Sequence, residues 1–246
     1  MERKLTVAPP EITYPKVVLV VVAHPDDADF GAGGTIAKWI SEGVEVHYCL
    51  ASSGGAGGFD TEIDRDLIPA IRESEQRRAA EIYGVHSIEF LGFSDGFIEA
   101  NLKLRGEISR VIRTIRPDTV LCQSPERNYQ RIQASHPDHL ATGEATLRSV
   151  YPDARNPFAF PELLEKGLEP HIVSQVFMMA GPNHNFVSDI SLTINDKIAA
   201  LLEHKSQIKD PDALGKMIMS SALNNAREAS LAPGVYAELF QVIKIA

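Results

Sequence analysis

The sequence predicts an α/β protein with a single domain, built on a doubly wound, mostly parallel sheet. The chain has 246 residues, a length that one domain of this class commonly has. Residues 17–22 form a continuous aliphatic run, which is typical of a strand covered on both faces. Beyond this run, strand-like and helix-like patterns alternate along most of the chain, which favours parallel strands joined by helical crossovers.

The first segments predict one strand–helix–strand unit behind an arm. Residues 1–15 contain three prolines and are predicted to be an extended N-terminal arm, so that the domain itself comprises residues 16–246. The unit is expected as a strand, a helix and a second strand at residues 17–22, 33–41 and 44–51.

The alternation continues after a glycine-rich loop at residues 52–58. A charged, periodic segment then predicts a long helix with Ile71, Ala79 and Ile82 on its buried side and Gly84 as its C-cap. The helices after the loop are expected at residues 68–83, 102–115, 139–150 and 195–208, and the strands at 87–91, 119–123 and 173–179. The end of the chain has a mixed pattern. This order predicts a Rossmann-like sheet with helices on both faces.

The composition restricts the partners and the location of the protein. Lys and Arg number 24 against 33 Asp and Glu, and the resulting net charge of −9 disfavours nucleic acid because phosphate binding needs clustered cations. The two cysteines cannot form a disulfide framework, and no apolar run approaches the ~20 residues of a membrane-spanning helix. We therefore expect a cytoplasmic protein without a membrane span. The proline-bearing arm and acidic surface favour a homo-oligomer.

Polar side chains follow the first predicted strand directly, in the motif His24-Pro25-Asp26-Asp27. In open α/β sheets, ligands bind beyond the carboxyl ends of the strands. One imidazole and two carboxylates at the edge of an apolar core need compensation of their charge, which a divalent cation provides. A helix N-cap would explain one aspartate alone. The set that includes a histidine favours a metal site.

A second cluster, His136-Pro137-Asp138-His139, follows the strand predicted at residues 119–123 and a loop. Alone, this pattern is equally compatible with a solvated turn. Two clusters at the ends of two parallel strands can converge, however. Zinc with three protein ligands and one open position is the usual hydrolytic arrangement, and histidine with carboxylate is a suitable ligand set. The paired motifs therefore predict a metal-dependent hydrolase.

With these motifs the sequence resembles the LmbE-like, or PIG-L, family of zinc-dependent de-N-acetylases. This family includes N-acetylglucosaminyl-phosphatidylinositol de-N-acetylase and the deacetylases of mycothiol and bacillithiol synthesis. The resemblance covers most of the chain, in landmarks at residues 23–27, 31–35, 72 and 75, 90–96, 136–139 and 204–207. It implies a hydrolase that removes the acetyl, or another N-acyl, group from an N-acetylated amino sugar or glycoconjugate.

The resemblance also implies a role for individual residues. His24, Asp27 and His139 correspond to the ligands of one Zn²⁺ per subunit, with another divalent ion such as Fe²⁺ as the alternative. Asp26 corresponds to the general base, because a carboxylate must take the proton of the attacking water. His136 would stabilise the oxyanion or protonate the departing amine, and Asp138 would orient it. Asp26 and Asp27 can divide these tasks only if they point to different sides of the loop.

Substrate contacts are implied at two further positions, and each has a plain structural alternative. Arg72 and Asp95 would contact the sugar, but Arg72 could pair with a glutamate of its own helix, and Asp95 precedes a glycine in a natural turn. Some family members have a tyrosine two residues before the second motif. In those members the tyrosine is an extra donor to the oxyanion. This chain has Ala134 at that position, and Tyr129 could replace the missing donor.

Two other functions remain open from the residues alone. Glycines 31, 33 and 34 could belong to a nucleotide-binding protein, although the dinucleotide fingerprint requires them directly after the strand, where the two aspartates stand. A non-catalytic carbohydrate-binding module could retain the metal for its structure, although structural zinc sites normally have four protein ligands. The resemblance suggests a supporting role for His204, which a packed helix histidine would explain equally well. His184 lies in a turn-rich loop that could border the pocket, and neither histidine is expected to bind the metal.

Overall fold

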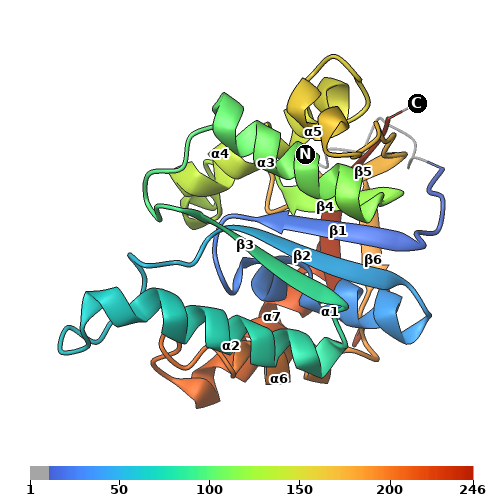
Figure 1. The fold of residues 1–246 in the computed structure, drawn as a ribbon. Helices are drawn as coiled ribbons and strands as arrows, with labels where there is room; N and C mark the ends of the chain where they lie inside the picture. The colour runs from blue at the N-terminus through green and yellow to red at the C-terminus, as the bar shows by residue number, and fades with distance from the viewer. Residues whose placement is uncertain (1–10, 246) are drawn as a thin grey trace.

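The computed structural model describes residues 11–245, and its centre is one seven-stranded sheet in the order β3-β2-β1-β4-β5-β7-β6 (Figure 1). The first five strands in this order are parallel, and β7 runs antiparallel to both β5 and β6. The strands are β1 Val17–Val22, β2 Glu45–Ser52, β3 Ser87–Phe93, β4 Thr119–Gln123, β5 Gln175–Met179, β6 Phe186–Asp189 and β7 Ala237–Lys244. The predicted doubly wound, mostly parallel sheet is confirmed.

Helices cover both faces of this sheet (Figure 1). One face carries α1 Asp27–Ser41, α2 Ile68–Tyr83, α6 Ile194–Leu201 and α7 Pro211–Glu228. The other face carries α3 Leu102–Ile115, α4 Pro137–Arg148 and α5 Pro161–Glu165. Three short helical turns complete the elements, at η1 Arg65–Leu67, η2 Ile132–Ser135 and η3 Ser149–Asp153.

Strand β1 shows why both faces are covered. Its side chains alternate between two apolar cores, because successive residues of a strand point to opposite faces. Val18, Val20 and Val22 pack into the core under α1 and α2, whereas Leu19 and Val21 pack into the core under α3 and α4. All five side chains are fully buried. The aliphatic run is therefore required by a strand with two buried faces.

Most predicted elements are present, some with ends shifted by about two residues, such as α4, β3 and β5, and three predictions were wrong by more than that. Helix α1 begins at Asp27 instead of residue 33, because Asp26 adopts a left-handed backbone (φ 86°) that turns the chain directly into the helix. Helix α6 ends at Leu201, before the predicted residue 208. Ile82, predicted on the buried side of α2, is 41% exposed. The buried side of α2 instead carries polar residues, among them Arg72, Glu75 and Gln76.

Only part of the predicted N-terminal arm lies in the described structure. Residues 1–10 lie outside the described residues, and residues 11–15 have neither helix nor strand. The carbonyl of Thr13 accepts a hydrogen bond of 2.6 Å from Gln175 Nε2, and Tyr14 hydrogen-bonds Glu42. In the part of the chain from residue 11 to 245, no helix is long and apolar enough to cross a membrane.

Candidate metal centre and active site

The two sequence motifs meet at the carboxyl ends of β1 and β4. These strands are neighbours, and the chain leaves them toward opposite edges of the sheet, which creates a crevice at this point. The Ala23 amide donates to Gln123 Oε1 over 3.0 Å, so that the ends of the two strands are tied together. His24 to Asp27 follow β1, and His136 is the N-cap of α4, which begins with Pro137, Asp138 and His139. The predicted convergence is confirmed.

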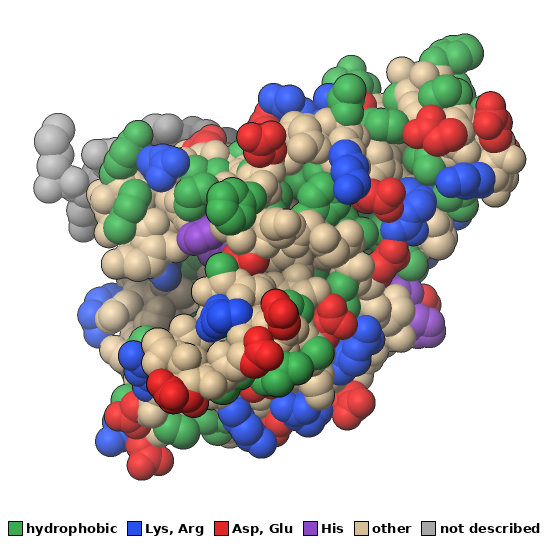
Figure 2. Space-filling model, turned by 60° about the vertical axis from the view of Figure 1, so that its left-hand side comes forward, with side chains coloured by type: hydrophobic (Ala, Val, Ile, Leu, Met, Phe, Trp, Pro, Cys, Tyr) green, Lys and Arg blue, Asp and Glu red, His purple; other side chains and the backbone are tan. Residues whose placement is uncertain are grey.

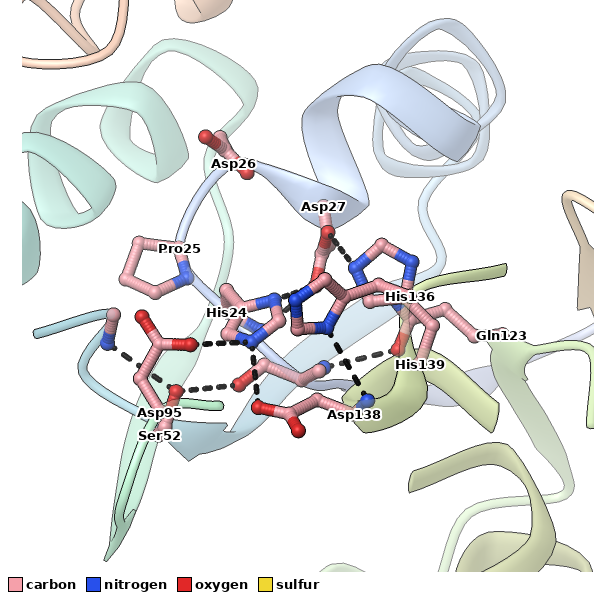
Figure 3. A network of polar contacts seen from close by, with 12 residues as sticks. His24, Pro25, Asp26, Asp27, Ser52, Asp95, Gln123, His136, Asp138 and His139 are labelled. Carbon is pink, nitrogen blue, oxygen red and sulfur yellow. Dashed lines mark hydrogen bonds and ion pairs between the residues drawn. The ribbon is translucent and has the colours of Figure 1, made fainter. Parts of the chain in front are cut away.

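Three histidines form the centre of the site (Figure 3). Nitrogen atoms of His24, His136 and His139 lie within 4.8 Å of one another, and the ring centroids are 5.1 to 5.4 Å apart. Imidazole nitrogens this close, contributed by separate segments, suit a divalent transition-metal ion. The cluster is a possible metal site.

Asp27 lies between two of these histidines. Its Oδ1 is 3.0 Å from His139 Nε2, and its Oδ2 is 3.4 Å from His24 Nδ1. His139 Nδ1 donates to the carbonyl of Ala134 over 3.2 Å, which fixes the ring and leaves Nε2 facing Asp27. A backbone carbonyl on the second ring nitrogen is typical of a metal-binding histidine. The predicted ligands His24, Asp27 and His139 are thus in mutual contact.

Two more carboxylates surround His24. Its Nε2 is 3.0 Å from Asp95 Oδ1 and 3.1 Å from Asp138 Oδ2. Burial lowers the pKa of His24, but hydrogen bonds to Asp138, Asp27 and Asp95 raise it much further, so that the net pKa is raised. Three carboxylates about one buried imidazole concentrate negative charge, which a proton on His24 compensates only in part. The residues present therefore fit a bound divalent cation.

Asp26 lies on the other side of the turn, away from the three histidines (Figure 3). Its Oδ2 accepts from Arg72 Nη2 over 3.2 Å, and its backbone amide donates to Gln76 Oε1 over 2.8 Å. Burial raises the pKa of Asp26 to about 6, although the charge of Arg72 lowers it. Asp26 and Asp27 thus point to different sides of the loop, as their predicted division of tasks requires.

A backbone amide determines the tautomer of the His136 ring. The amide of Asp138 donates to His136 Nδ1 over 3.2 Å, so that the neutral ring carries its proton on Nε2 and can donate it. Burial and the charge of His24 lower the pKa of His136. Asp138 orients His136 only through this amide. Its carboxylate instead accepts from the amides of Gly96 and Ile98, at 2.7 and 3.2 Å, and from His24.

Arg72 is buried, unlike an arginine that forms an ion pair on the surface of a helix. It is 4% exposed and donates to the carbonyls of Gly54 and Pro25 over 2.8 and 2.7 Å. A Cβ on Gly54 or Gly57 would lie 2.2 Å from its Nη1, so the glycine-rich loop closes on the guanidinium because glycine leaves room for it. Asp95 Oδ2 accepts from the Ala56 amide of the same loop. Direct contacts of Arg72 and Asp95 with a sugar stay predictions.

Asp26 is supported by Gln76 and, through it, by Asp29, neither of which was among the predicted site residues. Gln76 Nε2 donates to Asp29 Oδ2 over 2.9 Å, and His204 Nε2 donates to the same oxygen over 2.8 Å. His204, in the turn after α6, and Asp29 are both fully buried. Gln76 follows Arg72 by four residues and therefore lies on the same helix face, which is the signal that could have found it.

The buried His204–Asp29 pair predicts a specific dependence of stability on pH. Burial lowers the pKa of His204, but the hydrogen bond to Asp29 and its charge outweigh this effect and raise it. A histidine whose pKa is raised by folding stabilises the protein fully at pH values below its ordinary pKa of about 6.5. This stabilisation is lost as the pH rises through the pKa of the folded state. In urea unfolding, the free energy of unfolding of His204→Gln should therefore fall below that of wild type by more near about pH 6 than near about pH 9.

The control for this measurement is His86→Gln, because the His86 side chain is 64% exposed at the edge of the sheet. It should change the free energy of unfolding little at either pH. A deficit of His204→Gln that stays constant, or grows with pH, would contradict the assigned pairing.

The glycines of α1 do not form a phosphate-binding loop. Gly31, Gly33 and Gly34 lie within the helix, and an added Cβ would be 2.1 to 2.7 Å from Met179, Tyr83 and Ile190, respectively. These glycines permit close packing of α1 against its neighbours. The side chain of Tyr129 is 85% exposed, and its suggested role as a donor stays a prediction. His184 lies 3.6 Å from Glu228, outside the histidine cluster.

The fold and the cluster define an α/β protein with a histidine–carboxylate site of the kind that binds a divalent cation. Its relatives specify the family. The PIG-L family model, described as GlcNAc-PI de-N-acetylase, matches residues 19–150, more than half of the chain. The chain therefore belongs to the PIG-L family of de-N-acetylases, as the motifs implied, and this is a hydrolase family.

Individual relatives agree with this assignment. The chain is 34% identical to diacetylchitobiose deacetylase of Thermococcus kodakarensis over 195 residues, 79% of this chain and 71% of that protein. It is 32% identical to a probable N-acetyl-alpha-D-glucosaminyl L-malate deacetylase 2 of Bacillus cereus over 197 residues, 77% of this chain and 83% of that protein. The solved N,N'-diacetylchitobiose deacetylase of Pyrococcus horikoshii has a TM-score of 0.83 at 29% identity, covering 93% of this chain and 84% of that one.

Proposed function

We propose that this chain hydrolyses the amide of an N-acetylated amino sugar or its glycoconjugate, with one divalent cation, preferably zinc, held by His24, Asp27 and His139. The observation that carries the proposal is the contact of Asp27 with both histidines, 3.0 Å from His139 and 3.4 Å from His24, at the point where β1 and β4 end. When bound, the cation supplies a Lewis acid that polarises the amide carbonyl.

The chain's own residues perform the proton transfers. Asp26 takes a proton from the water that adds to the carbonyl carbon, and its pKa of about 6 keeps it mostly ionised at neutral pH. His136 donates from Nε2 to the developing oxyanion or to the departing nitrogen. The C–N bond breaks, the acyl group leaves as a carboxylate, and the amino sugar leaves with the transferred proton. Asp138 holds His24 and His136 in place.

The relatives support two substrate classes for a direct test. Diacetylchitobiose and N-acetylglucosaminyl malate are the compounds in the names of two relatives. Purified protein supplied with zinc should release acetate and an equal amount of free amine from at least one of them. If the protein binds zinc but releases no acetate from these or other N-acetyl amino sugars, the result would favour a non-catalytic carbohydrate-binding module instead.

Substitution of His136 separates proton donation from metal binding. We expect His136→Ala to keep its zinc and its substrate KM but to lose about 10²–10³ in kcat, because one donor to the oxyanion is removed. The measurement is zinc content together with kcat and KM. Loss of the zinc would make His136 a ligand, which its place within 4.8 Å of the other two histidines would allow.

A further inference from the structure

One face of α2 holds the peptide bond that leads into Asp26. Arg72 and Gln76 lie on this face because they are four residues apart on the helix. Arg72 Nη2 donates to the Pro25 carbonyl over 2.7 Å, and Gln76 Oε1 accepts from the Asp26 amide over 2.8 Å. Both polar groups of the peptide between Pro25 and Asp26 are therefore bound by side chains of one helix.

This peptide precedes an unfavourable backbone conformation. Asp26 has φ 86° and ψ −24°, in the left-handed region that is uncommon outside glycine. Such a conformation persists only where surrounding contacts fix it. It also separates the two aspartates of the turn, with Asp27 beside the histidines and Asp26 pointing away from them (Figure 3). Contacts that fix this turn therefore also fix the direction of the predicted general base.

The Gln76 amide is itself held in one orientation. Its Nε2 donates to Asp29 Oδ2 over 2.9 Å, and His204 Nε2 donates to the same oxygen over 2.8 Å. An ionised carboxylate only accepts hydrogen bonds, so the nitrogen side of the Gln76 amide faces Asp29 and its oxygen side faces the Asp26 amide. Reversal of the Gln76 amide would place two donors together at one end and two acceptors together at the other.

Gln76 is too deeply buried to contact a substrate. Its side chain is 0% exposed, whereas Figure 2 shows a hollow at the surface with a histidine side chain at its margin. A side chain this enclosed influences the reaction only through the residues that it contacts. An apolar side chain of similar size would fill the space between α1 and α2 without burying an amide. It could not accept a hydrogen bond from the Asp26 amide.

We propose that Gln76, anchored by Asp29 and His204, is a positioning residue that holds the Asp26 turn and keeps the base directed at the attacking water. This inference rests on the proposed function, in which Asp26 takes the proton of that water. The hydrogen bond to the Asp26 amide exists before any reaction takes place. It can therefore be tested both by kinetics and by a measurement that needs no turnover.

Kinetics of Gln76→Met give the first test. Methionine has about the size of glutamine but can neither accept from the Asp26 amide nor donate to Asp29. We expect kcat to fall about 10- to 100-fold, because a small displacement of a reacting group has an effect of this order. Substrate KM and zinc content should stay unchanged, since no substrate or metal contact is removed. A kcat within about threefold of wild type would overturn the proposal.

Gln175→Met is the matched control. Gln175 is also buried, at 2% exposure, and its Nε2 donates to the Thr13 carbonyl and to Thr119 Oγ1. It is the first residue of β5 and therefore lies at the end of the sheet opposite the site. The control should lower the free energy of unfolding, as Gln76→Met does, but keep kcat. An equal loss of kcat in both variants would contradict a positioning role for Gln76.

The same substitution in the Asp26→Asn protein shows whether Gln76 acts through Asp26. If it does, Gln76→Met has no base left to misplace, and its effect on kcat should shrink to less than about threefold in this background. A purely structural role would lower kcat by the same factor in both backgrounds. Equal factors would therefore overturn the proposal.

Hydrogen exchange of the Asp26 amide gives a readout without turnover. In the zinc-loaded protein, NMR should show this amide exchanging at least about tenfold faster in Gln76→Met than in wild type. The Ala23 amide is the internal reference, because it donates to Gln123 Oε1 and should not change. Equal exchange of the Asp26 amide in both proteins would overturn the positioning role even if no amide were hydrolysed. Absence of hydrolysis by wild type would separately refute the proposed function.

Discussion

Asp26→Asn is expected to lower kcat by about 10²–10⁴ while the protein keeps its metal and its fold, because the amide cannot accept the proton of the attacking water. The substitution is mild for the surrounding structure. An asparagine oxygen can still accept from Arg72 Nη2, which lies 3.2 Å from Asp26 Oδ2. Asparagine also tolerates the left-handed backbone of this position, where φ is 86°. The measurement is kcat and zinc content of the variant against wild type.

The control for this substitution is Asp60→Asn in the exposed loop before α2. It removes the same charge outside the site and should leave kcat unchanged. If Asp26→Asn retains activity within a few-fold of wild type, Asp26 is not the base. Its contact with Arg72 would then be purely structural, with the aspartate serving the turn into α1.

His139→Ala is expected to lose the bound metal, from about one ion per chain to none, and with it all measurable hydrolysis. The His139 ring is held by Ala134 at one nitrogen and faces Asp27 with the other, so its removal takes one donor from the predicted set of three. Elemental analysis after dialysis measures the ion, and circular dichroism checks the fold. The fold should persist because His139 belongs to none of the three apolar clusters of the described residues.

His86→Ala serves as the matched control, since its exposed ring lies next to His47 and outside the cluster of His24, His136 and His139. It should keep both metal and activity. Unchanged metal content in His139→Ala would remove this residue from the ligand set. Because His136 lies within the same cluster, the two alanine variants together decide which histidines hold the ion.

The order of the strands and helices could be predicted because local signals determine it. The aliphatic run at β1 requires two covered faces, and the ends of α2, α3 and β4 coincide with the predicted ones. Short-range patterning failed where distant contacts override it. Helix α6 stops at Leu201, and the residues beyond it bind elsewhere: His204 pairs with Asp29, and Ser206 donates to Glu75.

The sequence by itself determined which chemical groups the site contains. One motif places a histidine and two aspartates after a strand, and the other places two histidines and an aspartate at the opening of a helix. Together they indicate a metal-type centre where parallel strands end side by side. Only the tertiary structure decided the partners of each group. Asp138 binds His24 with its carboxylate and His136 with its amide, and Gln76 connects Asp26 to Asp29. Such pairings depend on angstrom-scale distances between segments up to 175 residues apart, such as Asp29 and His204, which no local sequence pattern encodes.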